Sequence, residues 1–248
     1  MSIFCNTAKK MAEYELEEFV IGGERFSLTT IAFMPIEALM ANQSKEVEIS
    51  GQKLWCGSLS VAEYLLRHRD WVIGSTVVEL GAGTGVVSML CKRLGAASVV
   101  LTDNDPRSLQ HMQDDCKVNG IDEGAVVESL DWFNFQGGEQ VWTAWGGGST
   151  SRRVVAGDVL YKRQLLEPFF STVRQLLSPS AEGVGAEMLL CHVPRAGVDH
   201  ADVVRSAEEH GLGAHEVERD LWCTGALLEY CPEEDTSRAR LYKIVFVK

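Results

Sequence analysis

The stretch from Val77 to Gly85 constrains the fold of this chain more than any other. Val77, Val78 and Leu80 are typical of a short buried strand, and a glycine-rich turn follows at once. Beyond the turn, apolar side chains recur at helical spacing, so the segment is predicted to be a strand, a tight turn and a helix. Glycines let such a turn reverse sharply and leave room for a ligand against the main chain.

A carboxylate stands at the matching place on the next predicted strand. Residues 97–102 are expected to form this strand, and Asp103 follows it, 18 residues beyond Gly85. At the carboxyl edge of a parallel sheet, this side chain is placed to accept hydrogen bonds from both hydroxyls of a ribose. The two features together predict a nucleoside site. The alternative is a glycine turn that only packs a helix on the sheet.

The spacing of the turn discriminates among nucleoside cofactors. Its glycines stand at 81, 83 and 85, whereas a dinucleotide fingerprint has its third glycine at the position of Val86. Glu79 precedes the first glycine by two residues, and a carboxylate there suits a cationic amino group better than a pyrophosphate. The turn therefore resembles motif I of the class I S-adenosylmethionine-dependent methyltransferases. A nicotinamide or flavin site is the alternative.

Composition and charge limit the class of partner. The 248 residues are 46% hydrophobic and 23% charged, which is typical of a soluble globular chain with one full core. A formal charge of −12 disfavours nucleic acid and favours a protein partner with a basic segment. The cysteines contain no Cys-x-x-Cys pair, which indicates reduced thiols and no metal site. The sequence shows no signal-peptide pattern and no apolar run of membrane length, so we expect the protein in the cytoplasm, with the nucleus also open. We also expect a monomer.

The remainder of the chain alternates predicted strands and helices. A hairpin is expected at 19–28 around Gly22-Gly23, within an N-terminal extension of residues 1–52. From 53 to 248 we expect one catalytic domain. Ser58 is expected to cap a helix with Leu59 and Leu65 on its apolar face, and Asp105-Pro106 to open another. Further strands are expected at 126–130, 153–157, 187–192 and 241–247, with helices at about 165–177 and 200–210.

Alternation of this kind predicts an α/β fold, Rossmann-like and doubly wound, with a largely parallel sheet covered on both faces. Residues 133–153 are rich in glycine and are predicted to be loop-like. A long loop inside a compact domain is usually functional or disordered. Whether this one closes over a substrate stays open.

Residues at the carboxyl edge of the sheet point to one family as a set. Leu54-Trp55, the 78–85 turn, Leu101-Thr102-Asp103, Leu130-Asp131-Trp132 and Asp158-x-x-Tyr161 together resemble the seven-β-strand protein lysine methyltransferases often called methyltransferase family 16. The resemblance covers about residues 53–247. It implies a seven-stranded sheet and S-adenosylmethionine as cofactor, with S-adenosylhomocysteine as product and no metal. The chain departs from the family in its long 133–153 loop and in Gly157, where alanine is common; the second departure is expected to matter little.

The resemblance also implies a role for each matched residue. Trp55 would line the methionine end of the cofactor, and Asp103 would hold the ribose. Trp132 would pack on the adenine, with Asp131 close to the exocyclic amine of that base. Other contacts with the cofactor would come from Glu79, Gly81, Ala82, Gly83, Gly85, Asn104 and Gly157.

Asp158 and Tyr161 would face the acceptor nitrogen and orient it while water removes its proton. Other roles stay open: a helix cap for Asp158, and plain packing for the aromatic residues Trp55, Trp132 and Tyr161. The predicted function is methylation of a lysine side chain of a protein. Because the fold hosts many acceptors, the alternatives are methylation of protein histidine or arginine, or of a small molecule, and a non-catalytic cofactor-binding role.

Overall fold

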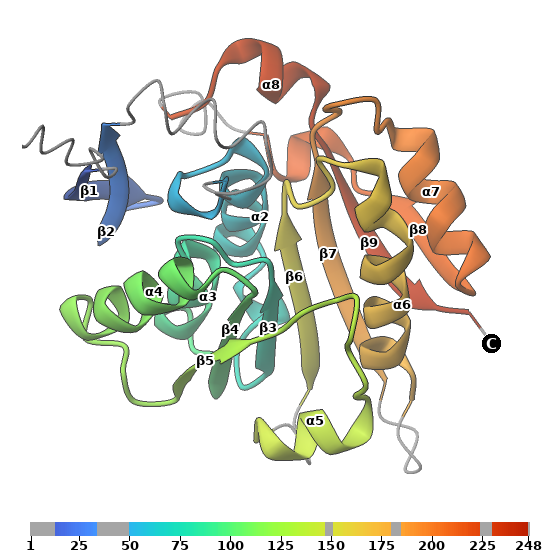
Figure 1. The fold of residues 1–248 in the computed structure, drawn as a ribbon, viewed down its shortest axis with the longest axis horizontal. Coiled ribbons are helices and arrows are strands. Elements are labelled where there is room, and N and C mark those ends of the chain that lie inside the picture. The colour runs from blue at the N-terminus through green and yellow to red at the C-terminus, as the bar shows by residue number, and fades with distance from the viewer. Residues whose placement is uncertain (1–12, 34–49, 147–150, 180–184, 224–229, 248) are drawn as a thin grey trace, which may run out of the picture.

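The computed structural model describes residues 13–33, 50–146, 151–179, 185–223 and 230–247. A seven-stranded sheet in the order β5-β4-β3-β6-β7-β9-β8 forms its centre (Figure 1). β9 runs antiparallel to β7 and β8, and the other pairs are parallel. The expected α/β fold with a mostly parallel sheet is confirmed. The strands are β3 Thr76–Leu80, β4 Ser98–Asp103, β5 Ala125–Ser129, β6 Arg152–Gly157, β7 Ala186–His192, β8 Leu212–Glu216 and β9 Arg240–Phe246.

The strand order reverses beside β3. The strands β4 and β5 extend the sheet on one side of β3, and β6 and β7 extend it on the other. In an open α/β sheet, ligands bind in the crevice that such a reversal leaves beyond the carboxyl ends of the strands. Because the glycine turn directly follows β3, the topology places it at this crevice.

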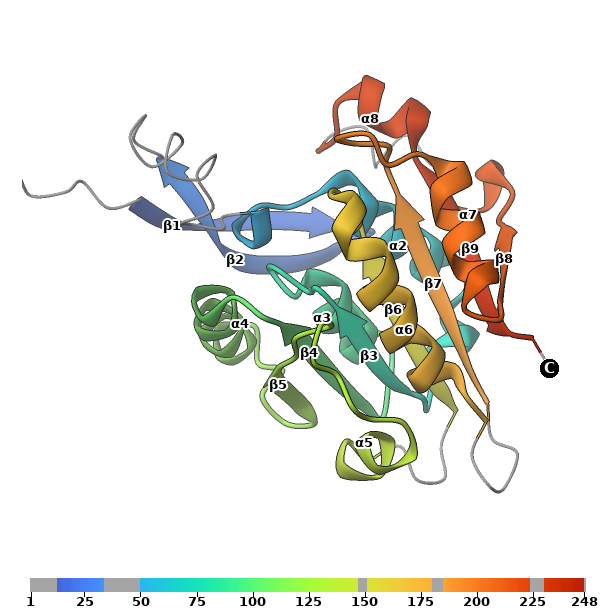
Figure 2. The same cartoon turned by 45° about the vertical axis from the view of Figure 1, so that its right-hand side comes forward.

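Helices cover both faces of the sheet (Figure 2). As a consequence, every residue of the central strand β3 is buried. One face carries α2, α3 and α4, and the other carries α6 and α7. These helices are α2 Cys56–Arg67, α3 Val86–Arg93, α4 Pro106–Val118, α6 Leu166–Leu177 and α7 His200–Glu209, and the short turns are η1 Ser50–Gln52, η2 Arg69–Trp71, η3 Arg163–Leu165 and η4 Arg219–Leu221.

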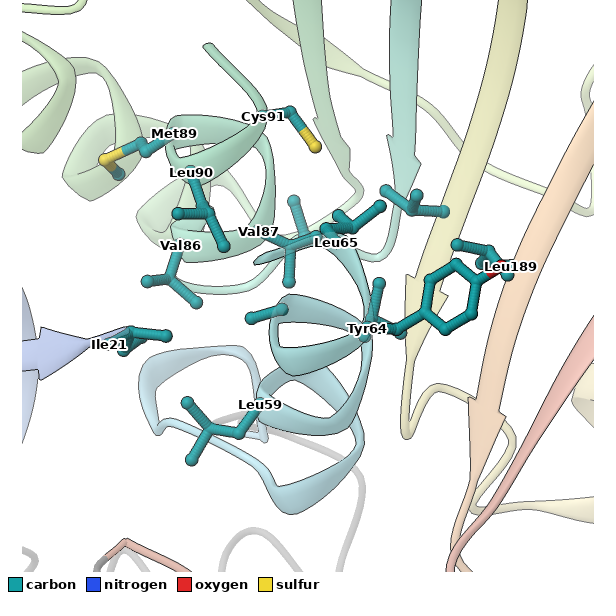
Figure 3. Packing of buried hydrophobic residues seen from close by; sticks show 14 of the residues in the cluster. Ile21, Leu59, Tyr64, Leu65, Val86, Val87, Met89, Leu90, Cys91 and Leu189 are labelled. Carbon is teal, nitrogen blue, oxygen red and sulfur yellow. The ribbon is translucent and has the colours of Figure 1, made fainter. Parts of the chain in front are cut away.

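The core on the α2 face joins helices and hairpin in one cluster (Figure 3). Leu59 and Leu65 of α2, which the sequence predicts to be apolar contacts, are buried with Val87 and Leu90 of α3. Ile21 joins them from the hairpin. Burial of one such side chain stabilises the fold by about 2 kcal/mol, so the cluster fixes α2 firmly against the sheet.

The predicted hairpin is present and longer than expected. Its strands, β1 Glu13–Ile21 and β2 Glu24–Phe33, pair antiparallel around the two-glycine turn. The backbone N–H and the hydroxyl of Thr29 donate to the Asp115 carboxylate of α4, at 2.8 and 2.6 Å. The hairpin is thus tied to the layer of helices that also holds α2 and α3.

The helix starts differ in how they are capped. As predicted, Asp105 caps α4 by accepting the Arg107 backbone N–H, and Pro106 takes the first helical position. The expected cap of α2 by Ser58 is wrong, because α2 already begins at Cys56 and no side chain caps it. Trp55 has extended backbone angles of −105° and 150°, and its carbonyl accepts the first helical hydrogen bond. Tertiary contact, not a capping residue, therefore sets where α2 begins.

The loop expected over 133–153 contains a helix, α5 Glu139–Ala144. Trp142 is 1% exposed, and its Nε1–H donates to the Leu176 carbonyl at 2.9 Å. The Ser98 hydroxyl, at the start of β4, donates to the Trp145 carbonyl at 3.3 Å. Burial of these aromatic rings outweighs the surrounding glycines, and α5 lies at the amino-terminal edge of the sheet (Figure 1).

Two elements near the C-terminus were not predicted. β8 pairs with β9 at one edge of the sheet, and α8, Glu233–Arg238, lies beyond the carboxyl ends of the strands near α2 (Figure 1). The sequence of β8 includes Gly213 and Ala214 and lacks a strong strand pattern. Within the described ranges, every helix is too short or too polar to cross a bilayer.

Candidate functional site

A cavity of about 450 Å³ lies beyond the carboxyl ends of the central strands. Its volume falls in the range of pockets that hold small molecules, about 300–1,000 Å³. All but two of the residues that the sequence predicts for the site line it together: Trp55, Gly81, Ala82, Gly83, Asp103, Asn104, Asp131, Trp132, Gly157, Asp158 and Tyr161.

The glycine turn forms one wall with bare backbone. Gly81 and Gly83 have φ angles of 64° and 56°, in the left-handed region that favours glycine. A Cβ on Gly81 would lie 3.3 Å from the Trp132 ring, and one on Gly83 would lie 2.8 Å from the Gly51 carbonyl oxygen. Side chains at these two positions would therefore clash with the residues that surround the turn, and only glycine lets the turn pack this closely.

Asp103 presents a fixed carboxylate to the cavity. Its Oδ2 accepts the Gly83 N–H at 3.0 Å, and its Oδ1 accepts the N–H groups of Asn104 and Asp105 at 2.8 and 3.0 Å. Burial raises the pKa of Asp103, and these backbone donors oppose the rise. A carboxylate has about four lone-pair sites, and the backbone uses three of those on Asp103. The remaining site on this side chain fits a ribose hydroxyl.

An aromatic surface lies beside this carboxylate. The Trp132 ring meets Phe169 edge-on, with centroids 5.0 Å apart, and it covers Gly81. The Asp131 carboxylate accepts the backbone N–H of Phe133 at 3.0 Å and the side-chain amide of Asn134 at 2.6 Å. This flat apolar wall with an acidic neighbour fits an aromatic base.

The structure does not bring Glu79 and Gly85 to the cavity wall. The Glu79 side chain is buried and accepts the Ser88 backbone N–H at 2.9 Å, and burial raises its pKa to about 7. Gly85 precedes α3 with φ 72°, and a Cβ there would lie 2.5 Å from Leu101. Both residues shape the turn and the start of α3 from behind the cavity.

At the other end of the cavity, β6 meets the first turn of α2. A Cβ on Gly157 would lie 2.4 Å from the Ser58 nitrogen, and one on Gly57 would lie 2.5 Å from the Asp158 nitrogen. The expectation that glycine at 157 matters little is therefore wrong, because the two backbones touch there. Asp158 itself has φ 61°, a strained value for a residue other than glycine.

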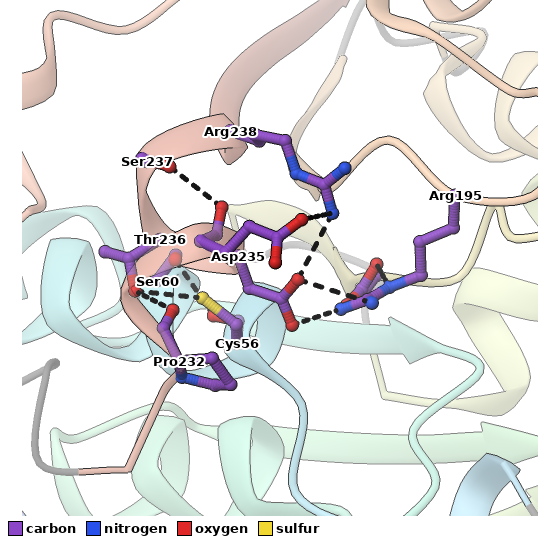
Figure 4. A network of polar contacts seen from close by, with 10 residues as sticks. Cys56, Ser60, Arg195, Pro232, Asp235, Thr236, Ser237 and Arg238 are labelled. Carbon is purple, nitrogen blue, oxygen red and sulfur yellow. Dashed lines mark hydrogen bonds and ion pairs between the residues drawn. The ribbon is translucent and has the colours of Figure 1, made fainter.

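Asp158 is bonded to Arg195, a residue that the sequence analysis did not single out. Figure 4 shows Arg195 beside Asp235. The Arg195 Nη2 lies 2.8 Å from Asp158 Oδ2 and 2.9 Å from Asp235 Oδ2 of α8. Its guanidinium also lies 5.0 Å from the centroid of the Trp55 ring. Burial raises the pKa of Asp158, and Arg195 opposes the rise. An isolated arginine in a loop belongs to no sequence motif. Its position just after β7, at the carboxyl edge of the sheet, was the one sequence feature that could have suggested it.

Two lysines complete this end of the cavity and were also missed. Lys53 and Lys162 both line it, and their ammonium groups lie 5.0 Å from the centroids of the Trp55 and Tyr161 rings, respectively. The acceptor end, defined here as the part around Trp55, Asp158 and Tyr161, thus mixes both signs of charge. Among the described residues, no cluster of three or more side chains is arranged to hold a metal ion.

Sequence comparison relates the chain to known enzymes. The profile of the family described as lysine methyltransferase matches residues 36–201. The chain is 26% identical over 131 residues to "Protein-lysine N-methyltransferase EFM3" of Chaetomium thermophilum, covering 52% of this chain and 39% of that protein. It is 33% identical over 122 residues to "Methyltransferase-like protein 22" of Mus musculus, covering 47% and 30%. The matched parts thus span less than half of these relatives.

Comparison with solved structures agrees on the fold. The ribosomal protein L11 methylase of Lactobacillus delbrueckii subsp. bulgaricus superposes with a TM-score of 0.50 at 16% identity, covering 77% of this chain and 79% of that one. A geranyl diphosphate methyltransferase in complex with S-adenosylmethionine gives 0.51 at 14% identity, covering 77% and 85%. At such low identity these likenesses concern the fold alone. Since the family profile matches most of its length, the chain belongs to the lysine methyltransferase family.

Proposed function

We propose that this protein transfers a methyl group from S-adenosylmethionine to a lysine side chain of a protein substrate. The observation that carries the proposal is one cavity with two chemically different ends. One end has bare glycine backbone, the Asp103 carboxylate and the Trp132 ring, and the other has Asp158 and Tyr161. Membership of the lysine methyltransferase family supports the choice of acceptor.

The first end is suited to the nucleoside part of the cofactor. Asp103 would accept a hydrogen bond from a ribose hydroxyl, Trp132 would pack on the adenine, and the backbone of Gly81 and Gly83 would contact the cofactor directly. Trp55 lines its methionine end. When bound, S-adenosylmethionine supplies a methyl group that the acceptor nitrogen takes as the sulfur–carbon bond breaks, which leaves S-adenosylhomocysteine.

Asp158 and Tyr161 orient the acceptor amine in line with that methyl group. A lysine nitrogen attacks only when it is neutral, and its reference pKa of about 10.4 makes loss of the proton at pH 7 cost roughly 4–5 kcal/mol. Water at the open end of the cavity takes this proton. The reaction requires no strong base among the side chains. The protein orients the acceptor amine and excludes other directions of approach to the methyl group.

The partner and compartment complete the proposal. The formal charge of −12 favours a substrate with a basic segment around the target lysine. The cysteines within the described ranges are free thiols, which supports a reducing compartment such as the cytoplasm. We propose that the enzyme acts there as a monomer.

The proposal is tested first by calorimetric titration of the purified protein with S-adenosylmethionine and S-adenosylhomocysteine. Lysate proteins are then incubated with tritiated S-adenosylmethionine and the enzyme, and the labelled residue is identified by mass spectrometry. Asp158→Asn is expected to bind both cofactor forms as the wild type does and to lose most of the transfer.

Label on lysine that depends on Asp158 would support the proposal. Label on histidine, arginine or a small molecule would mean that the acceptor is that group and not lysine. Binding without transfer would favour a non-catalytic role, and a folded sample that binds neither cofactor form would remove the methyltransferase interpretation.

A further inference from the structure

Three charged side chains from separate parts of the chain meet at the acceptor end. Asp158 follows β6, Arg195 lies in the loop after β7, and Asp235 belongs to α8. Figure 4 shows Arg195 and Asp235 pointing toward each other. The guanidinium also bonds the Asp158 carboxylate. The side chains are 2%, 23% and 19% exposed, respectively. Formal charges of −1, +1 and −1 give this triad a net charge of −1.

Arg195 bonds both oxygens of the Asp158 carboxylate. Its Nε lies 3.3 and 3.2 Å from the two oxygens of Asp158, and its Nη2 lies 2.8 Å from Oδ2. Arg195 and its neighbour Ala196 line the cavity together with Asp158. The positive charge therefore stands in the cavity wall, within reach of an incoming amine.

Other charged and titratable groups surround the triad on every side. Arg238 bonds Asp235 at 3.4 Å from within α8, and Glu234 lies 3.7 Å from Arg238. The thiol of Cys56 in α2 contacts Thr236 of α8 at 3.8 Å. Further groups of the described residues that face the acceptor end, lie beneath it or interact with Arg195 include Lys53, Tyr161, Lys162, Cys191, His192 and Cys231.

Resting on the proposed function, we propose that Arg195 sets the protonation of the acceptor lysine by offsetting the charge of Asp158. A bare carboxylate within about 4–6 Å stabilises an ammonium, whereas a nearby cation destabilises it. With Arg195 in place, the ammonium gives its proton to water more readily, and the lone pair becomes available to the methyl group. Asp235 holds the guanidinium and limits the strength of this effect.

The test uses two substitutions that move the triad charge in opposite directions. Arg195→Gln changes it from −1 to −2, and Asp235→Asn changes it from −1 to 0. The acid limb of the pH–rate profile is expected to move up by about one pH unit in the first variant and down by a similar amount in the second. At pH 7 the first variant then loses about tenfold in rate, because one unit is a tenfold change in neutral amine. Arg195→Lys retains the charge and should keep the profile close to that of the wild type.

The measurement is the initial rate of tritium transfer to one labelled lysate protein between pH 6 and pH 10, with cofactor affinity followed by calorimetry. Glu234→Gln is the matched control, because its side chain is 80% exposed and, among the described residues, forms an ion pair only with Arg238. The pH–rate profile of this variant should be that of the wild type. Opposite shifts with unchanged cofactor affinity would support the role of Arg195. Equal losses at every pH would mean that the triad is only structural and would overturn it. A wild-type protein that binds cofactor and transfers no label would overturn the proposed function instead.

Discussion

The two ends of the cavity are built in different ways. At the cofactor end, Asp103 is held by the N–H groups of Gly83, Asn104 and Asp105, and Asp131 by its own loop. At the acceptor end, Arg195 bonds Asp158 and Asp235, which are 37 and 40 residues away from it. One end depends on contacts between neighbours in the chain, and the other on side chains that only the tertiary fold brings together.

This difference separates the binding of the cofactor from the selection of the acceptor. Any substitution other than proline leaves the backbone N–H donor in place, so the cofactor end is fixed once the turn has formed. The acceptor end depends on how α2, α8 and the loop after β7 pack, and each of them can change alone. We therefore expect substitutions at the two ends to affect different measured quantities.

The largest effect is expected for Asp103→Ala. This carboxylate accepts the proposed ribose hydrogen bond, which as a bond to a charged group contributes roughly 1.5–3 kcal/mol, and it also holds the glycine turn through the Gly83 N–H. The dissociation constant for S-adenosylhomocysteine, measured by calorimetry, should rise by about 100-fold or more. Asp131→Ala is the matched comparison; its carboxylate bonds Phe133 and Asn134 of its own loop and does not hold the glycine turn, so a rise within about tenfold is expected. Equal losses in both variants would contradict the assignment of the ribose to Asp103.

Glu79→Gln tests whether the acid of the glycine motif serves the cofactor or the fold. Burial raises the pKa of Glu79 to about 7 from 4.5, so the folded protein keeps a proton that the unfolded chain releases. Stability from this group is full below pH 4.5 and is lost as pH rises to about 7, by about 3 kcal/mol. The glutamine variant, whose amide oxygen still accepts the Ser88 N–H, should lack this loss when urea unfolding is followed between pH 4.5 and 8.

Cofactor affinity is the second measurement for this variant. Because Glu79 lies behind the cavity wall, the dissociation constant for S-adenosylhomocysteine should change by less than about threefold. A loss of tenfold or more would place the carboxylate in contact with the cofactor, as the resemblance to motif I implies.

How well the sequence predicted each part follows from the same contrast. The turn after β3, Asp103 and the Asp105-Pro106 helix start depend on contiguous residues, and each was predicted in place. Arg195 and Asp235 were missed because no spacing links them, and α5 was missed because Trp142 forms its helix through burial against α6. Gly157 was judged by its residue type alone, whereas its importance comes from Ser58, which is distant in the sequence.

Gly157→Ala tests the contact on which the acceptor end depends. Its new methyl group would lie 2.4 Å from the Ser58 nitrogen, so α2 must shift away from β6. Overpacking of this kind typically destabilises a protein by about 2 kcal/mol, measured by urea unfolding. Gly185→Ala is the matched control, because no atom of the residues that the structure describes lies within 4 Å of the added Cβ, and it should unfold as the wild type does. If both variants unfold alike, the backbones are not in the contact described.

The smallest effect is expected where α2 enters the acceptor end. Ser58 is the third residue of the helix and does not cap it, so Ser58→Ala should change the free energy of unfolding by less than about 0.5 kcal/mol. Asp199→Ala is the comparison, because Asp199 forms a capping box with Asp202 at the start of α7 and should lose about 1 kcal/mol. A loss at Ser58 as large as at Asp199 would mean that α2 begins later than Cys56. The start of α2 would then depend on a local cap, and the acceptor end would be less dependent on tertiary contact than its other residues indicate.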